Sequence, residues 1–182
     1  VTGRETTKVY AEATRYYKGT SLPDFEGGFT SNMRYKNFDL NLIFNFSVGG
    51  QILDTDYSSL MNGFGSPGGN AHPDNSNRWQ NPGDITDVPR LVAGNNNDNA
   101  RSTRFLFDND YLRLKSLTLG YNLPADMVKT AGFSNVRFFV QADNVVTFQS
   151  HKGIDPEQSF GGTTARRSPQ FRTVSTGVTL SF

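Results

Sequence analysis

Apolar and polar residues alternate along one segment of this chain with a period of two. From Phe38 to Val48 every even-numbered residue is apolar, and the odd-numbered residues are polar except Ile43. Successive side chains of a β-strand point to opposite faces of a sheet. The segment therefore predicts a strand with one apolar face and one polar face.

The length of this segment favours a membrane strand over a soluble one. At about 3.3 Å per residue and a tilt of about 45°, its eleven residues rise about 26 Å, close to the ~25 Å apolar band of outer-membrane barrels. Strands of soluble proteins are usually only about 5–6 residues long. Length alone thus points toward a lipid bilayer.

The alternation recurs elsewhere, mostly apolar at even positions in 136–146 and 172–182 and at odd positions in 29–35. Charged residues keep to the polar parity, except Arg172, which begins its strand. Arginine facing lipid at mid-membrane would cost about 2–4 kcal/mol. The sequence predicts an all-β fold, an antiparallel up-and-down transmembrane β-barrel, with residues 9–17 as a candidate sixth strand. The predicted strands are 27–36, 38–49, 110–122, 135–148 and 171–182.

One predicted strand, 110–122, breaks the alternation. Leu112 and Leu114 have one parity, whereas Leu117 and Leu119 have the other. Either a β-bulge near Lys115 reverses the facing, or other parts of the protein bury one half of the strand. The sequence does not choose between these two explanations.

Short and long connections alternate between the strands. Residues 35–38 form a tight hairpin and 123–135 a brief turn with one helical turn at 125–130, whereas the loops 50–109 and 149–170 are long. Outer-membrane barrels have short periplasmic turns and longer extracellular loops, so we expect the long loops outside the cell. Within the first long loop, residues 52–61 predict a short helix.

Composition narrows the classes of function. The 182 residues include 18 Lys and Arg against 17 Asp and Glu, with no basic stripe, so nucleic-acid binding is not expected. Cysteine is absent, which excludes disulfides and thiolate metal sites. No apolar run approaches the ~18 residues of a transmembrane helix. The chain starts at Val1, and we expect it to be a piece of a longer protein.

Several motifs resemble SusC/RagA-type TonB-dependent outer-membrane transporters. The stretch Tyr111–Pro124 is similar to the family signature YLRLKNVTLGYTLP, and Gly153–Glu157 resembles its GxDPE segment. Weaker matches complete the resemblance from about Pro23 to Phe182: Asn41–Gly49 with Gln51–Leu53, Arg78–Trp79 with Asp87–Leu91, and Val140–Phe148.

The resemblance implies a 22-stranded barrel of which residues 1–182 supply the C-terminal part, the last five or six strands. It implies import of oligosaccharides or peptides across the outer membrane with a SusD-like surface lipoprotein. It also implies energy coupling to the TonB complex through an N-terminal region outside this chain.

Catalytic chemistry has little support in the sequence. His72 and His151 lie in loops without a metal-binding spacing, and the carboxylate pairs Asp54/Asp56 and Asp108/Asp110 fit solvated turns better than a calcium site. We therefore expect no enzyme activity, cofactor or metal. The rival to transport is a soluble all-β carbohydrate-binding module, with the apolar faces buried between two sheets.

Ligand contacts are expected in the long loops. Candidates for stacking on a sugar or packing against a lid protein, or simply for packing within the loop, are Tyr57, Phe64 and Trp79, and candidates for an anionic ligand are Arg166 and Arg167. The alternating residues Val178, Leu180 and Phe182 resemble the signal that the barrel-assembly machinery reads. Phe182 is equally suited to a lipid-facing aromatic girdle.

Overall fold

A computed structural model describes residue 7 and residues 9–62, 68–92, 97–130, 132–158, 161–164 and 168–182. The chain divides into two compact units. The sheet unit comprises residues 22–50, 108–158 and 168–182, and the loop unit comprises residues 1–21, 51–107 and 159–167. In the described ranges no helix is long and apolar enough to cross a membrane.

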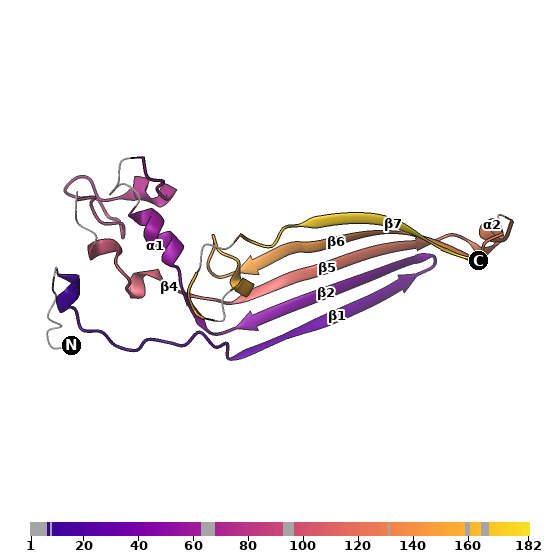
Figure 1. The fold of residues 1–182 in the computed structure, drawn as a ribbon, viewed down its shortest axis with the longest axis horizontal. Helices are drawn as coiled ribbons and strands as arrows, with labels where there is room; N and C mark the ends of the chain where they lie inside the picture. Colours follow the sequence, from indigo (N-terminus) through magenta and orange to yellow (C-terminus); the bar gives the residue numbers. More distant parts are fainter. Residues whose placement is uncertain are drawn as a thin grey trace. The chain divides into compact units, whose positions relative to one another are not determined.

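The sheet unit is built around five described antiparallel strands, in the order β1–β2–β5–β6–β7 (Figure 1). Each strand pairs with the next one along the chain once the short strands β3 and β4 are set aside. The predicted antiparallel up-and-down fold is confirmed, here as an open sheet. The strands are β1 (Phe25–Tyr35), β2 (Phe38–Val48), β5 (Tyr111–Asn122), β6 (Asn135–Gln149) and β7 (Thr173–Ser181), with ends within two residues of those predicted.

The strand register sorts apolar and polar side chains onto opposite faces. Residues directly opposite in an antiparallel pair share a face. Phe29 lies opposite Phe44, with the two rings stacked 4.5 Å apart, whereas Asn32 lies opposite Asn41 on the other side. The predicted segregation is therefore present in the folded sheet, although Ile43 also lies on the polar face.

The apolar face of the sheet is open. Val140, Val178 and Leu180 are 45%, 51% and 48% exposed, and Phe29 and Phe138 are exposed to a similar extent. A soluble sandwich buries such side chains against a second sheet. The exposed face removes the main support for the soluble carbohydrate-binding alternative.

A β-bulge reconciles the two halves of β5. Ser116 pairs with Ile43 and Leu114 with Phe44, so Lys115 is an extra residue on β5. Because of it, the leucines on both sides of the bulge lie on the apolar face. The first of the two explanations for this strand is correct. In β6 the register shifts at the same level, where Asn144 has a φ of 52°.

The short connections are compact. Tyr35 pairs with Phe38 across a two-residue turn in which Lys36 has a φ of 52°. Helix α2 (Ala125–Thr130) follows β5, and its Val128 is buried, as is Val136 at the start of β6. These residues close the end of the sheet opposite the long loops.

The loop unit has a small core of its own. It contains η1 (Tyr10–Glu12), β3 (Gln51–Leu53), α1 (Thr55–Met61), η3 (Pro73–Asn77), η4 (Asn97–Asn99) and η5 (Thr103–Phe105), and most of β4 (Leu106–Asp108), which pairs with β3. Met61, Val88 and Phe105 are buried together. The short helix η6 (Pro156–Gln158) belongs to the sheet unit.

Both long loops contribute to the loop unit. Leu53 of β3 forms a bridge with Thr163, and the Thr164 hydroxyl accepts hydrogen bonds from the backbone N–H groups of Thr55 and Asp56. The side chain of Asp54 accepts from the Tyr57 N–H and caps the same helix. Asp54 is therefore a buried helix cap rather than a solvated turn residue.

Two local predictions require correction. Residues 9–17 form no strand: the segment contains the 3-10 turn η1, and the Tyr10 hydroxyl donates to the carbonyl of Arg101 in the loop unit. The predicted helix 52–61 begins only at Thr55, since Ile52 pairs in β3 and Asp54 sets the helix start.

Candidate functional site

The polar face of the sheet carries two clusters of charged side chains, one toward each end of the strands. The first lies where β5 and β6 meet the long loops, and the second lies beside the β1–β2 hairpin. The second cluster is built from strand residues of the polar face, whereas the first also includes Asp155, Glu157 and Gln170 of the loop after β6.

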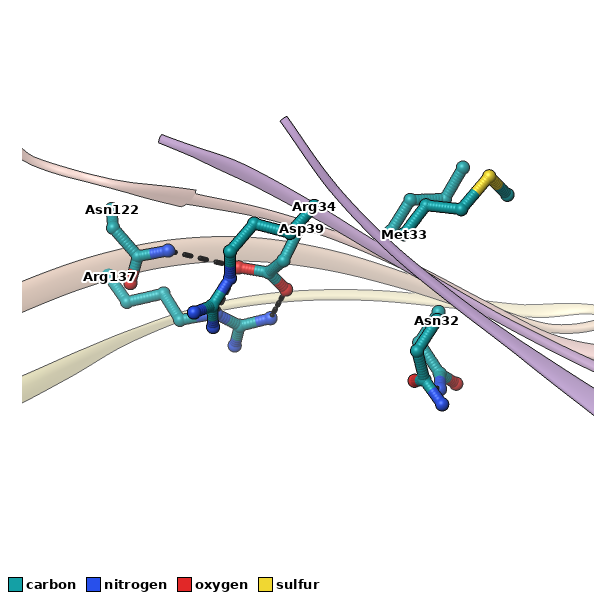
Figure 2. Close-up of a pocket in the computed structure, with 8 residues that line it drawn as sticks. Asn32, Met33, Arg34, Asp39, Asn122 and Arg137 are labelled. Carbon is teal, nitrogen blue, oxygen red and sulfur yellow. Dashed lines mark hydrogen bonds and ion pairs between the residues drawn. The ribbon is translucent and has the colours of Figure 1, made fainter. Parts of the chain in front are cut away.

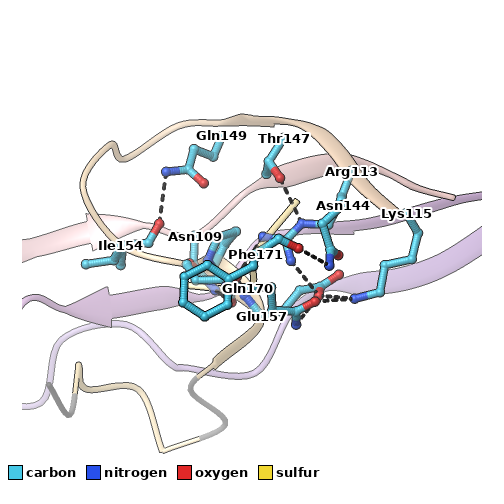
Figure 3. Close-up of polar contacts among 12 residues, drawn as sticks. Asn109, Arg113, Lys115, Asn144, Thr147, Gln149, Ile154, Glu157, Gln170 and Phe171 are labelled. Atoms are coloured by element: carbon cyan, nitrogen blue, oxygen red, sulfur yellow. Dashed lines mark hydrogen bonds and ion pairs between the residues drawn. The ribbon is translucent and has the colours of Figure 1, made fainter. Parts of the chain in front are cut away.

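The first cluster is centred on Arg113 of β5 (Figure 3). Its Nε donates to Thr147 Oγ1 of β6 at 2.8 Å, Nη2 donates to Asp155 at 2.6 Å, and Nη1 donates to Glu157 at 2.8 Å. Its side chain is only 5% exposed, and that of Asp155 only 2%. Arg113 thus ties two strands to the loop that follows β6.

Lys115 completes the first cluster through the bulge. Its Nζ donates to Glu157 and to Gln170 Oε1, while Ser116 donates to Asp143 on the same face of the sheet. Two consecutive residues of β5 therefore make polar contacts on one side. The bulge allows this without turning Leu114 away from the apolar face.

Asp155 is held ionised by three donors. Burial disfavours its charge, but the Arg113 guanidinium and the backbone N–H groups of Gln170 and Glu157 outweigh burial and lower the pKa of this carboxyl below 3.8. The positive charges of Arg113 and Lys115 balance the negative charges of Asp155 and Glu157. The cluster is suited to fixing the loop rather than to binding a charged ligand.

The second cluster joins β2 to β6 across β5 (Figure 2). Asp39 Oδ1 accepts from Arg137 Nε at 3.0 Å and from Asn122 Nδ2 at 3.0 Å. Gly120 lies between the two partners, and a Cβ there would lie 2.4 Å from Arg137 Nη2. The missing side chain of Gly120 leaves the room that the ion pair occupies.

An open cavity of about 520 Å³ adjoins the second cluster. Arg34 and the carboxamides of Asn32 and Asn41 line it together with Asp39 and Arg137. Figure 2 shows Arg34 beside the ion pair, on the same side of the sheet. The polar face thus offers hydrogen-bonding groups along its length.

The predicted loop contacts have different surroundings. Tyr57 packs on the core of the loop unit, with its ring edge-on to His72 and Phe105, and its hydroxyl donates to Asp74 at 2.8 Å. Burial and the Asp74 carboxylate raise the pKa of Tyr57 to about 12. Trp79 is half-buried, 6.0 Å from the Arg90 guanidinium.

Three predicted contacts, Phe64, Arg166 and Arg167, lie outside the described residues. Within the described residues, Tyr57 and Trp79 are both held by neighbours of the same loop. Their suitability as ligand contacts stays a prediction.

The residues of the proposed assembly signal lie along the edge strand and its end. Val178 and Leu180 project from the apolar face of β7, and Phe182 is 91% exposed, with its ring 5.2 Å from Phe133. This position fits either an assembly signal or a lipid-facing girdle.

Sequence reasoning missed both charged clusters. Arg113 and Asp155 are 42 residues apart, so no local pattern connects them. One signal was present in the sequence. Arg113 and Lys115 of β5 are two residues apart, and so are Asp155 and Glu157 in the loop after β6. Among the described residues no group of three or more His, Cys, Asp or Glu side chains could hold a metal ion.

Comparison with known proteins finds relatives and solved structures that are similar to this chain. No family model matches the chain. It is 36% identical over 181 residues to TonB-dependent receptor P3 of Formosa agariphila, covering 93% of this chain, and 31% identical over 142 residues to TonB-dependent receptor P39 of the same organism, covering 76%. The RagAB peptide importer in its closed-closed state has a TM-score of 0.77 and 28% identity over 91% of the chain.

This chain belongs to the SusC/RagA-type TonB-dependent receptors. The open-open state of the RagAB peptide importer is also similar, with a TM-score of 0.73 and 27% identity over 97% of the chain. The chain spans 17% of the length of receptor P3, 14% of receptor P39, and 18% and 20% of the chains in the two importer structures. This TonB-dependent receptor segment therefore matches only part of the length of each relative.

Proposed function

We propose that this chain forms part of the wall and outer loops of a TonB-dependent importer of oligosaccharides or peptides in the outer membrane. It would supply the last five strands of a 22-stranded barrel, with the apolar face toward lipid and the polar face toward the lumen. The long loops would lie outside the cell, where a SusD-like lipoprotein would act as a lid.

The open apolar face is the observation that carries this proposal. Side chains such as Phe29 and Val140 are about half exposed on strands long enough to cross the apolar band of an outer membrane. Exposing that apolar surface to water would cost free energy, whereas contact with lipid hydrocarbon would not. The similarity to a peptide importer supports transport as the activity.

The two edges of the sheet give a second argument. Among the described residues, β1 and β7 each have one edge without a partner strand, and an exposed strand edge promotes aggregation. In a closed barrel both edges pair with further strands. Other strands of the same receptor would supply those partners.

Transport is tested in the source organism with the full-length receptor. Cells lacking its gene are compared with complemented cells for uptake of labelled oligosaccharide and peptide mixtures, each with and without a functional TonB. We expect uptake of at least one mixture to require both the receptor and TonB. Unchanged uptake of every mixture in the deletion strain would contradict import.

Localisation is tested in the same strains by fractionation. We expect the receptor in the outer-membrane fraction, released only by detergent, and co-purifying with a surface lipoprotein. Recovery of the full-length protein in the detergent-free soluble fraction would overturn the membrane assignment, whatever the uptake result.

A further inference from the structure

A second cavity lies wholly within the loop unit, between residues 10–18 and 101–106. Its volume is about 460 Å³, within the range of about 300–1,000 Å³ typical of small-molecule sites. Leu53 of β3 and Leu106 of β4 contribute apolar side chains to its lining. The cavity is thus a different site from the charged clusters on the polar face of the sheet.

Positive charge dominates the lining of this cavity. Arg15, Lys18 and Arg101 line it, and none of the described residues that line it is acidic. None of these three cations forms a salt bridge with another described residue. Uncompensated cations around one concave surface attract an anion and strengthen its binding.

Two tyrosines flank the cations. The Tyr10 hydroxyl donates to the Arg101 carbonyl at 2.7 Å, which links the two segments that form the cavity, and the Arg15 guanidinium lies 5.8 Å from the Tyr10 ring centre. Tyr16 also lines the cavity and is exposed. Aromatic faces beside hydrogen-bond donors suit a ligand with both flat apolar patches and charged oxygens.

We infer that this cavity binds a carboxylate of an acidic oligomer, either an acidic oligosaccharide or an acidic peptide. The inference rests on the proposed import function and narrows its cargo to molecules that carry negative charge. Guanidinium groups bind carboxylates through two parallel hydrogen bonds, and Arg15 and Arg101 supply two such groups from opposite segments. The tyrosine rings would pack against the ring or chain that bears the carboxylate.

Binding is measured by calorimetry on the purified full-length receptor in detergent. The acidic probes are trigalacturonate and an amidated tetraglutamate peptide, and the neutral probes are maltotriose and amidated tetraalanine. We expect at least one acidic probe to bind at least about tenfold more tightly than its neutral counterpart, and more weakly as salt rises. The pair that shows the difference identifies the source of the carboxylate.

Variants locate the binding to this cavity. We expect Arg101→Gln and Arg15→Gln each to weaken the acidic probe about tenfold, the loss expected for one charge-assisted interaction. Arg101→Lys, which keeps the charge, should retain part of the affinity. Lys129→Gln, which removes an exposed cation of α2 in the sheet unit, should leave binding unchanged. A thermal melt of each variant checks that it is folded.

Equal affinity for acidic and neutral probes, or full affinity in the folded Arg15→Gln/Arg101→Gln double variant, would overturn the inference. Cellular uptake separates this outcome from failure of the proposed function. If the receptor imports neutral and acidic cargo equally, the function stands and the charge preference is wrong. If calorimetry shows the acidic preference but no cargo is imported, the site stands and the import function is wrong.

Discussion

At the scale of single residues, Arg113 joins parts of the chain that are distant in sequence. It contacts Thr147 of β6 and two acids of the loop after β6, and both Arg113 and Asp155 are almost fully buried. Removing one partner of a buried pair leaves an unpaired charge and costs about 3–5 kcal/mol. The order of this loop therefore depends strongly on Arg113, beside the Lys115–Glu157 contact.

A double-mutant cycle tests this dependence. We expect Arg113→Gln alone to destabilise the full-length receptor by about 3 kcal/mol, and Arg113→Gln/Asp155→Asn to cost less than the sum of the two single changes. Thermal unfolding of the four proteins provides the values. Additive effects would show that the two side chains are not coupled.

Acid should weaken the same contact. The pKa of Asp155 is lowered below 3.8 in the folded protein, so its contribution to stability is complete above pH 3.8 and disappears as the pH falls through the lower, folded value. We expect the melting temperature of the receptor to fall below pH 3.8 more steeply than that of Asp155→Asn. Parallel pH profiles for the two proteins would contradict this expectation.

At the scale of elements, the bulge in β5 shows what the sequence does and does not determine. The opposite parities of Leu112 and Leu117 showed that the regular alternation of side-chain facing is interrupted near Lys115, because that alternation has a fixed period of two. They did not show which of two explanations holds, since burial by another segment would leave the same pattern. Pairing with β2 and β6 decides it.

Deletions distinguish a bulge from a regular strand. Deleting the extra residue Lys115 keeps all leucines of β5 on the apolar face, whereas deleting Thr118 reverses the facing of one half of the strand. We expect the first variant to assemble in the outer membrane, with a looser loop, and the second to fail. The yield of heat-modifiable receptor in outer-membrane fractions measures assembly, and equal yields would contradict the bulge.

The loops were less predictable than the strands for a physical reason. Strand parity is local, but Thr164 caps the helix that begins at Thr55, 109 residues away. The segment 9–17 looked strand-like, yet Tyr10 is bound to Arg101 in the loop unit. Long-range contacts of this kind depend on which surfaces meet in the folded chain. A repeating pattern in the sequence does not predict which surfaces these are.

At the scale of the whole molecule, the five described strands of the sheet unit make an open sheet with two different faces. On the polar face, Asp39 of β2 and Arg137 of β6 bind each other across β5. The absence of a side chain at Gly120 of β5 leaves space for this pair. Among the described residues, the opposite face exposes aromatic and aliphatic side chains. This asymmetry is what a wall between lipid and an aqueous lumen requires.

The accessibility of alternate side chains in the membrane tests this account most directly. Because this chain has no cysteine, single cysteines can be placed along β2 and β6 of the full-length receptor after any others are replaced, and then spin-labelled in lipid vesicles. The account predicts that labels at Leu40, Phe44 and Val140 collide mainly with dissolved oxygen, which partitions into lipid. Labels at Asn41, Asn45 and Gln141 should collide mainly with a water-soluble nickel complex. Accessibility without a period of two, or with the two sets reversed, would contradict it.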